Sequence, residues 1–517
     1  MNLLTDPLLR VQTAASEVRQ MSLPELFSAL GRDEVESLPG LQRHQADALH
    51  VFLCYLAGAI LARSGDTEPV QETSYWERGL VDLSEGQENW AWRLVVEDVS
   101  KPAFFQAPLP AADRLSLKAV TPDRLDLLPT AKNHDVKKAR GFYPHPDEWV
   151  YTLVSLQTMS GYFGSGQHGI SRMNSGYGNR PIVEIVHHRR PGGRWRDAVL
   201  RLSIHRKNIL DGPWGYNPKG LVLAWLRAWD GNTALSLKEL DPFYLEICRR
   251  VRLRMNEDMA IKAYGAKSDR PRIAAKQLNG NVGDGWLPID HRKAEISALT
   301  LGSSGITADI LRRLVFGDGL SLTPLQRPLE GAEGRVWLAV SVLVRGGGTT
   351  EGFREQWIPI SATVRHRLFG HKERREPLSN ISKAAVELAG TMRNRVLKPA
   401  VFCYVQGGAE EIKLDKKSSQ AWWDQIQQKY ERLWNDDFFP WLWSLPEGFD
   451  SDEARKAWAA RLRGHALVVL NEAILTMPKH IGHRYRAETQ ARRFFWGALY
   501  KHFPMLKENS HDAIFGK

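Results

Sequence analysis

The C-terminal part of the chain constrains its fold most, because from about His371 the sequence changes to long helical patterns. Four helix-sized segments follow one another, namely Leu378–Lys398, Ser419–Phe439, Ser451–Thr476 and Arg484–Phe503. Proline removes a hydrogen bond from a helix interior, so we expect the connections to contain Pro399, Pro440, Pro446 and Pro478. Antiparallel helices of this length pack around a shared core, and the pattern therefore predicts a four-helix bundle.

The earlier part of the chain mixes helical and extended patterns. We predict helices over 22–30, 41–63, 149–159 and 240–254, and a strand over 336–344 followed by a glycine-rich turn. A β-hairpin is predicted at 181–204, with the basic segment His187–Gly193 at its tip. A chain of 517 residues exceeds one ordinary core, so we expect two or three domains.

A glycine-rich stretch, Ser160–Pro181, stands between two apolar runs. Its glycines alternate with Gln, His, Arg, Asn and aromatic residues, and glycine allows a backbone to lie close against another surface. The composition therefore indicates either a loop shaped for contact or a flexible surface loop. A second loop, Thr130–Asp147, is basic and contains two prolines, so it either meets phosphates or is a solvated loop.

Charge and cysteine content narrow the class of protein. Lys and Arg outnumber Asp and Glu by 70 to 59, a formal net charge of +11 that favours a polyanionic partner. Three cysteines without a CxxC pair, Cys54, Cys248 and Cys403, argue against a disulfide scaffold and a cysteine-rich zinc site. The longest apolar run, Ala48–Ala62, is short for a bilayer span and no signal peptide is visible. We expect a cytoplasmic protein with buried thiols and no membrane role.

Sequence motifs for catalysis are weak in this chain. It has no G-x-S-x-G, no H-E-x-x-H, no P-loop lysine and no cysteine–histidine motif. The dipeptide His134-Asp135 has the residue types of a phosphohydrolase metal site, but further ligands at helical spacing are missing. The residues favour binding, and a metal-dependent nuclease acting through this dipeptide is the alternative.

Several short segments, in this order along the chain, resemble the CasA family. They are N-L-L-T-D-P-L-L-R-V at 2–11, P-A-F-F-Q at 102–106, N-H-D at 133–135, the glycine-rich stretch, G-D-G-W-L-P-I at 283–289, and L-V-R-G-G-G-T-T-E-G-F at 343–353 with I-P-I at 358–360. CasA proteins are the large subunit of the type I-E CRISPR Cascade complex.

The resemblance implies an α+β protein, with a mixed α/β N-terminal domain at 1–370 and a C-terminal four-helix bundle at 371–517. It also implies a subunit without an enzymatic activity or cofactor of its own. Some members of the family carry a cysteine cluster that binds zinc, and because this chain lacks such a cluster we expect no metal. Such a subunit recognises the PAM in target double-stranded DNA, helps to open the duplex for R-loop formation and recruits a helicase-nuclease. Its other partners would be crRNA and the backbone, small and crRNA-processing subunits of Cascade.

The resemblance also assigns candidate residues. For PAM and DNA binding these are Gly164, Gly166, Gly169, Arg172, Gly176, Gly178, Lys276 and Lys267. A wedge hairpin between PAM and protospacer would contain Ser303, Ser304, Gly305, Ile306 and Thr307, although the glutamine of a well-known family pattern is missing there. The loop that meets the crRNA 5′ end and the backbone subunits would contain Lys132, Asn133, His134, Lys137 and Lys138. A third hypothesis is a general RNA-binding scaffold.

Overall fold

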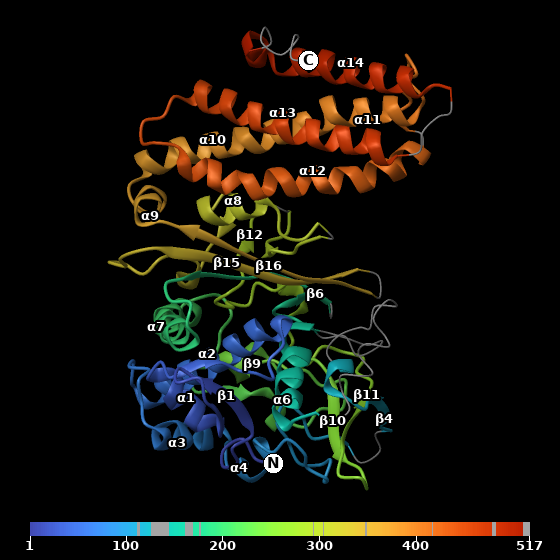
Figure 1. Cartoon of the computed structure of the whole chain (residues 1–517). Coiled ribbons are helices and arrows are strands. Elements are labelled where there is room, and N and C mark those ends of the chain that lie inside the picture. The colour runs from blue at the N-terminus through green and yellow to red at the C-terminus, as the bar shows by residue number, and fades with distance from the viewer. Residues whose placement is uncertain are drawn as a thin grey trace. The chain divides into compact units, whose positions relative to one another are not determined.

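The computed structural model describes residues 1–110, 114–125, 144–160, 169–174, 177–292, 294–302, 304–346, 349–415, 417–477 and 482–509. The chain splits into two compact units. Unit 1 comprises Met1–Ile306 and Gly317–Ala362, and unit 2 comprises Thr307–Phe316 and Thr363–Lys517. The predicted α+β class is confirmed, because unit 1 combines helices with small sheets and unit 2 is helical (Figure 1). The domain boundary at residues 370 and 371 stays a prediction.

Unit 1 is built around one buried helix, α2. The described helices of this unit are α1 (Leu23–Gly31), α2 (Arg43–Ser64), α3 (Thr73–Leu83), α4 (Glu88–Ala91), α6 (Pro146–Ser155) and α7 (Pro191–Leu210). Helix α9 (Ala362–Phe369) belongs to unit 2 except for its first residue. A π-helical turn, η2 (Leu156–Ser160), continues α6. Among the described residues, α2 alone is long and apolar enough to cross a bilayer, yet 83% of its most apolar window is buried inside the protein. This burial is typical of a core helix, as the sequence predicted.

The sheets of unit 1 are small and mostly antiparallel. Their strand orders are β2–β1–β3, β10–β11–β4, β13–β12–β14, β16–β15–β7, β5–β6 and the parallel pair β8–β9. The bounds of the strands are β1 Leu9–Thr13, β2 Val18–Met21, β3 Val35–Ser37, β4 Ser116–Ala119, β5 Met173–Asn174, β6 Tyr177–Asn179, β7 Ile182–Val186, β8 Leu221–Leu223, β9 Leu240–Leu245, β10 Arg250–Met255, β11 Ile261–Ala266, β12 Ile289–Asp290, β13 Ser297–Ala298, β14 Leu320–Ser321, β15 Val336–Gly346 and β16 Thr349–Ile360.

The longest strands, β15 and β16, form a hairpin whose register runs from Val336 opposite Ile360 to Gly346 opposite Thr349 (Figure 1). Strand β7 pairs with the other edge of β15, with Trp337 opposite Val186. The predicted strand at 336–344 is therefore confirmed. This sheet brings the end of β7, and the basic segment after it, beside the hairpin.

Two predictions for unit 1 were wrong. The segment after His187-His188 is not the return strand of a hairpin, because Pro191 occupies the first turn of the 20-residue helix α7. The segment 240–254 is not a helix but contains strands β9 and β10. All six residues of β9 are buried, and a strand buried on both faces lacks the alternation that distinguishes it from a buried helix.

Unit 2 is a bundle of long helices, as predicted. Its elements are α8 (Ala308–Phe316), α10 (Lys372–Thr391), the π-helical segment η7 (Met392–Leu397), α11 (Lys398–Val405), α12 (Lys417–Ser444), α13 (Ser451–Thr476) and α14 (Arg484–His502), with the 3₁₀ turn η8 (Pro504–Asn509) after them. The first predicted helix is one helical run from α10 through η7 to α11. With α12, α13 and α14, the described residues of the bundle therefore form four long helical segments (Figure 1).

The prolines of unit 2 do not all fall where we expected. Pro399 lies in the first turn of α11 and Pro440 lies inside α12, so neither is in a connection. Pro446 does lie between α12 and α13, and Pro478 is outside the described residues. Proline fits a first turn without loss of a hydrogen bond, and the π-helical segment just before α11 gives Pro399 this position.

Tryptophans fill the core of the bundle. Trp458 is fully buried, stacks on Trp441 at a centroid distance of 4.5 Å, and donates its Nε1–H to the carbonyl of Ala385 at 2.9 Å. The indole therefore buries its apolar body and also satisfies its polar atom.

Candidate nucleic-acid interface

The described C-terminal end of the glycine-rich stretch is held by a buried carboxylate. Glu246, in the loop after β9, accepts the backbone N–H groups of Ile170 at 2.7 Å and Ser171 at 3.0 Å. Burial raises the pKa of Glu246 to about 7, although these two N–H groups and the nearby Arg172 and Arg180 lower it. One side chain thus fixes the backbone just after the sequence Gly164–Gly169.

A buried arginine holds the same segment from its carbonyl side. Arg180 Nη1 donates to the carbonyl oxygens of Ile170, Ser171 and Met173, each at 2.6 Å. Burial lowers the pKa of Arg180 to about 10, so the guanidinium stays charged at neutral pH. Gly280 makes room for it, because a Cβ there would lie 2.4 Å from Arg180 Nη1. Glu246 and Arg180 together satisfy both donors and acceptors of this backbone.

The motif G-D-G-W supplies the third anchor. Asp284 Oδ2 accepts the Ser171 hydroxyl at 3.0 Å and pairs with Arg172 Nε at 3.1 Å, while its Oδ1 accepts the Trp286 N–H at 3.0 Å. Arg172 also lies over the ring of Tyr55, 5.5 Å from its centroid. Two of the sequence segments that carried the family resemblance therefore meet in space. We call Glu246, Arg180, Asp284 and Arg172 the anchor cluster.

The predicted DNA-binding residues lie in different environments. Arg172 is only 4% exposed and faces Asp284, so it supports the stretch from within. Gly169 is also buried, and a Cβ there would lie 2.5 Å from Met173 Cβ, so glycine is required for close packing. Gly178 lies in β6, which pairs with β5. Gly164, Gly166 and Gly176 lie outside the described residues.

The two candidate lysines are both exposed on unit 1. Lys276 begins a 3₁₀ turn (Lys276–Leu278) and Lys267 follows β11. The turn of Lys276 leads directly to Asn279 and Gly280, both in left-handed conformation, and Gly280 packs on Arg180. Lys276 thus lies four positions before Gly280, and Gly280 packs against Arg180 of the anchor cluster.

The predicted wedge segment has a different local structure from a hairpin. Ser304, Gly305, Ile306 and Thr307 form the loop before helix α8, and Gly305 has a φ of +66°. The family resemblance implied a hairpin here, but the residues that follow the loop, Ala308–Phe316, form a helix. Ser303 lies outside the described residues.

The predicted crRNA loop is also outside the described part of the chain. This concerns Lys132, Asn133, His134, Lys137 and Lys138, and also Asp135 of the nuclease alternative. Within the described ranges, no group of three or more His, Cys, Asp or Glu side chains could hold a metal ion. All three cysteines are free and buried, as expected.

Sequence reasoning missed the central residues of the anchor cluster. Glu246 was assigned to a helix, and Arg180 was noted only as part of the stretch. A buried carboxylate that accepts N–H groups 75 and 76 residues away has no local sequence signal. The one available hint was that two carboxylates, Asp241 and Glu246, stand inside an otherwise apolar run at 240–248.

A second buried network joins the motif G-D-G-W to α2 and α7. Glu184 on β7 pairs with Arg194 at 2.9 Å, Arg201 at 3.2 Å and His50 at 3.3 Å, and accepts the Trp286 Nε1–H at 3.3 Å. Burial alone would raise the pKa of Glu184, but the two arginines and His50 hold it well below its usual range. The carboxylate is therefore ionised and structural.

The described architecture defines an α+β protein with a terminal helical bundle, and solved structures with the same fold are CRISPR-associated proteins. Thermus thermophilus CasA (Cse1) has a TM-score of 0.62 at 15% identity, covering 97% of this chain and 99% of that chain. Cse1 from Thermobifida fusca has a TM-score of 0.61 at 16% identity, covering 98% of each chain. Cse1 from Acidimicrobium ferrooxidans has a TM-score of 0.59 at 16% identity, covering 97% and 98%.

No protein-family model and no curated protein sequence matches the chain. The resemblance to the CasA family that the sequence motifs indicated is confirmed at the level of the fold, over nearly the whole chain.

Proposed function

We propose that this chain is the large subunit of a type I-E Cascade-type complex, in which it recognises the PAM in target double-stranded DNA. One observation carries the proposal: the similarity to CasA and Cse1 structures spans 97% of the chain or more, so it includes both the mixed unit and the bundle. In this role the chain is not an enzyme. It promotes duplex opening and R-loop formation and recruits a separate helicase-nuclease, in the cytoplasm.

The anchor cluster gives this role a physical basis. A loop that presses its backbone into a DNA groove must be held in one conformation, because ordering it on binding would cost conformational entropy. Glu246 and Arg180 fix the backbone at one end of the glycine-rich stretch before any DNA arrives. Minor-groove acceptors distinguish few base pairs, which suits a short and degenerate motif.

Lys276 supplies the charged contact in this proposal, with Lys267 as its competitor. Assembled complexes containing crRNA and the backbone, small and crRNA-processing subunits would be titrated with a PAM-containing duplex at several salt concentrations. If the lysine reads a base, Lys276→Ala should weaken binding by about 1–3 kcal/mol. If it binds a phosphate, the variant should lower the salt slope, which is the slope of log affinity against log salt concentration, by about 1. Lys219→Ala, an exposed lysine of the same unit, is the matched control.

Affinity equal to the control for both Lys276→Ala and Lys267→Ala would remove the lysine assignment. A purified chain that cleaves nucleic acid with Mg²⁺ or Mn²⁺ would instead favour the nuclease alternative. Tight binding of single-stranded RNA without preference for a duplex motif would favour the general scaffold.

The glycines are tested separately. Gly166→Val and Gly178→Val should impair PAM recognition while the thermal unfolding profile stays unchanged, because a side chain would keep the backbone away from the groove. Unchanged PAM recognition in both variants would reduce the stretch to an ordinary loop.

A further inference from the structure

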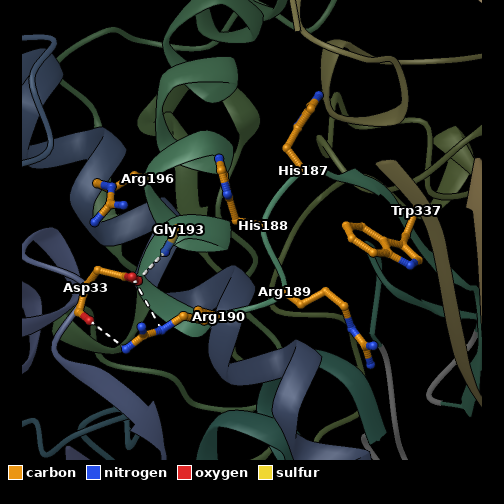
Figure 2. Close-up of a pocket in the computed structure, with 8 residues that line it drawn as sticks. All are labelled: Asp33, His187, His188, Arg189, Arg190, Gly193, Arg196 and Trp337. Carbon is orange, nitrogen blue, oxygen red and sulfur yellow. Dashed lines mark hydrogen bonds and ion pairs between the residues drawn. The ribbon is translucent and has the colours of Figure 1, made fainter. Parts of the chain in front are cut away.

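A cavity of ≈ 310 Å³ lies in unit 1 where β7 ends and α7 begins (Figure 2). Three arginines line it, Arg189, Arg190 and Arg196, together with His187 and His188. One carboxylate, Asp33, one indole, Trp337, and Gly193 complete the lining. The volume is at the lower end of the ~300–1,000 Å³ typical of ligand sites.

Among the residues that the structure describes, only Arg190 of these three arginines is paired with carboxylates. Arg190 Nε lies 3.4 Å from Asp33 Oδ2, and its Nη2 lies 3.6 Å from Glu36 Oε2. Figure 2 shows Asp33 joined to Arg190 and also to the backbone of Gly193, whose N–H it accepts at 3.0 Å. Asp33 thus neutralises Arg190 and already caps the first turn of α7. The N-terminus of α7 already has a carboxylate as its partner, so it is not the feature of this cavity that would attract an anion.

The other two arginines keep their charge without a carboxylate. Arg196 Nη1 donates to the carbonyl of Gly31 at 2.7 Å. The Arg189 guanidinium lies over two rings, 5.9 Å from the centroid of Trp337 and 5.5 Å from that of Trp357. In the described part of the chain, no carboxylate oxygen lies within 4.0 Å of either guanidinium. The cavity is a concave, net positive site with an aromatic wall.

We propose that this cavity binds phosphate groups through Arg189 and Arg196, each of which takes a phosphate of its own, because Figure 2 shows the two guanidinium groups on opposite sides of the cavity. A guanidinium presents a planar fork of donors that matches two phosphate oxygens, and its stacking on Trp337 and Trp357 orients this fork before binding. The phosphates come either from the phosphodiester backbone of a nucleic-acid strand or from free nucleotides. The site does not depend on PAM recognition, because none of its residues belongs to the glycine-rich stretch or the anchor cluster.

The test uses the full chain and titration calorimetry at low salt with three probes: inorganic phosphate, adenosine monophosphate and the oligonucleotide dT10. The variants are Arg189→Gln and the double variant Arg189→Gln/Arg196→Gln. Arg93→Gln is the matched control, since Arg93 is also exposed and lies over a tryptophan, 5.8 Å from the Trp90 centroid, but does not line this cavity. Lys276→Ala separates this site from the proposed PAM contact.

We expect Arg189→Gln to weaken binding at least threefold and the double variant at least tenfold, relative to Arg93→Gln. For dT10, the double variant should also lower the salt slope by about 1.4, as the loss of two single-strand phosphate contacts requires. A loss confined to dT10 identifies a phosphodiester strand as the ligand, and an equal loss for phosphate and the mononucleotide identifies a free phosphate.

Arg189→Gln alone is decisive if the double variant unfolds, because Arg196 also contacts Gly31. Binding of all three probes by Arg189→Gln with the affinity of Arg93→Gln would overturn the proposal. A loss of dT10 binding in Lys276→Ala that equals the loss in Arg189→Gln would also contradict it, because the two sites would then not be separate.

Discussion

The anchor cluster and the basic cavity are both rich in arginine, yet they use the charge in opposite ways. In the anchor cluster, Arg172 and Arg180 are 4% and 5% exposed and face Asp284 or backbone carbonyls. In the cavity, Arg189 and Arg190 are exposed, and Arg189 has an aromatic wall instead of a carboxylate. A buried cation must be satisfied by the protein itself, whereas an exposed one remains available for a ligand.

This difference leads to opposite expectations for mutation. Loss of a residue from the anchor cluster should first lower stability and then, as a consequence, DNA recognition. Loss of an arginine from the cavity should lower ligand affinity with little change in stability.

The largest effect is expected for Asp284→Ala. It would leave the buried Arg172 without its carboxylate and remove the acceptor of two further donors, at a cost of about 3–5 kcal/mol. Calorimetric unfolding of the chain should show a clearly lower transition temperature than Asp258→Ala, an exposed carboxylate. The double variant Arg172→Met/Asp284→Leu should recover much of the loss. Additive losses in that double variant would show that the pair is not coupled.

The next effect is expected for Glu246→Ala, which orphans the backbone N–H groups of Ile170 and Ser171 at a cost of about 2–3 kcal/mol. Hydrogen exchange of peptides that contain these amides should become faster by the factor to which this loss of free energy corresponds. The control Glu257→Ala, on an exposed turn, should leave the exchange rate unchanged. Protection equal to that of the wild type would mean that Glu246 does not hold the stretch.

A smaller effect is expected from pH. The folded-state pKa of Glu246 is about 7, raised by burial from its ordinary 4.5. Between pH 4.5 and 7, Glu246 is protonated while the segment around Ile170 and Ser171 is folded, and it loses its proton when this segment opens. Protonation therefore stabilises the folded segment. Protection of the Ile170 and Ser171 amides, corrected for intrinsic exchange, should therefore fall as pH rises from about 4.5 to 7 and then level off. A Glu246→Gln variant should lose this slope, and a slope that survives in it would assign the titration elsewhere.

The smallest effect on stability is expected for Arg189→Gln. An exposed cation–π contact is worth about 0.5–1 kcal/mol, so the unfolding temperature should stay close to that of Arg93→Gln. A loss as large as that of Asp284→Ala would show that Arg189 is structural, and the contrast between the two regions would fail.

Much of the local structure could be predicted from the sequence. Ser22 and Glu25 form the capping box that starts α1, with Ser22 N–H donating to Glu25 at 2.7 Å, and the unbroken apolar run of α2 predicted its burial. The sequence also contains a signal for the start of α7, namely Pro191 followed by Trp195, Val199 and Leu202 at helical spacing. We nevertheless predicted a strand there, because the basic segment before it was interpreted as the turn of a hairpin.

The anchor cluster could not be predicted in the same way. Arg172 was expected to bind DNA because of its place in a glycine-rich stretch, and only the packing of Asp284, 112 positions later in the sequence, shows that it is buried. Glu246 was misassigned because the buried strand before it gives no periodic signal. Contacts of this kind depend on how the elements pack, which local patterns do not specify.

The central claim is that the anchor cluster serves recognition of a DNA motif, while the basic cavity serves phosphate binding. It is tested most directly by the ratio of affinities of the assembled complex for target duplexes with and without a PAM. Glu246→Ala should reduce this ratio towards one, whereas Arg189→Gln should leave the ratio unchanged and lower both affinities if the phosphate belongs to the target strand. An unchanged ratio in a folded Glu246→Ala variant would contradict the claim.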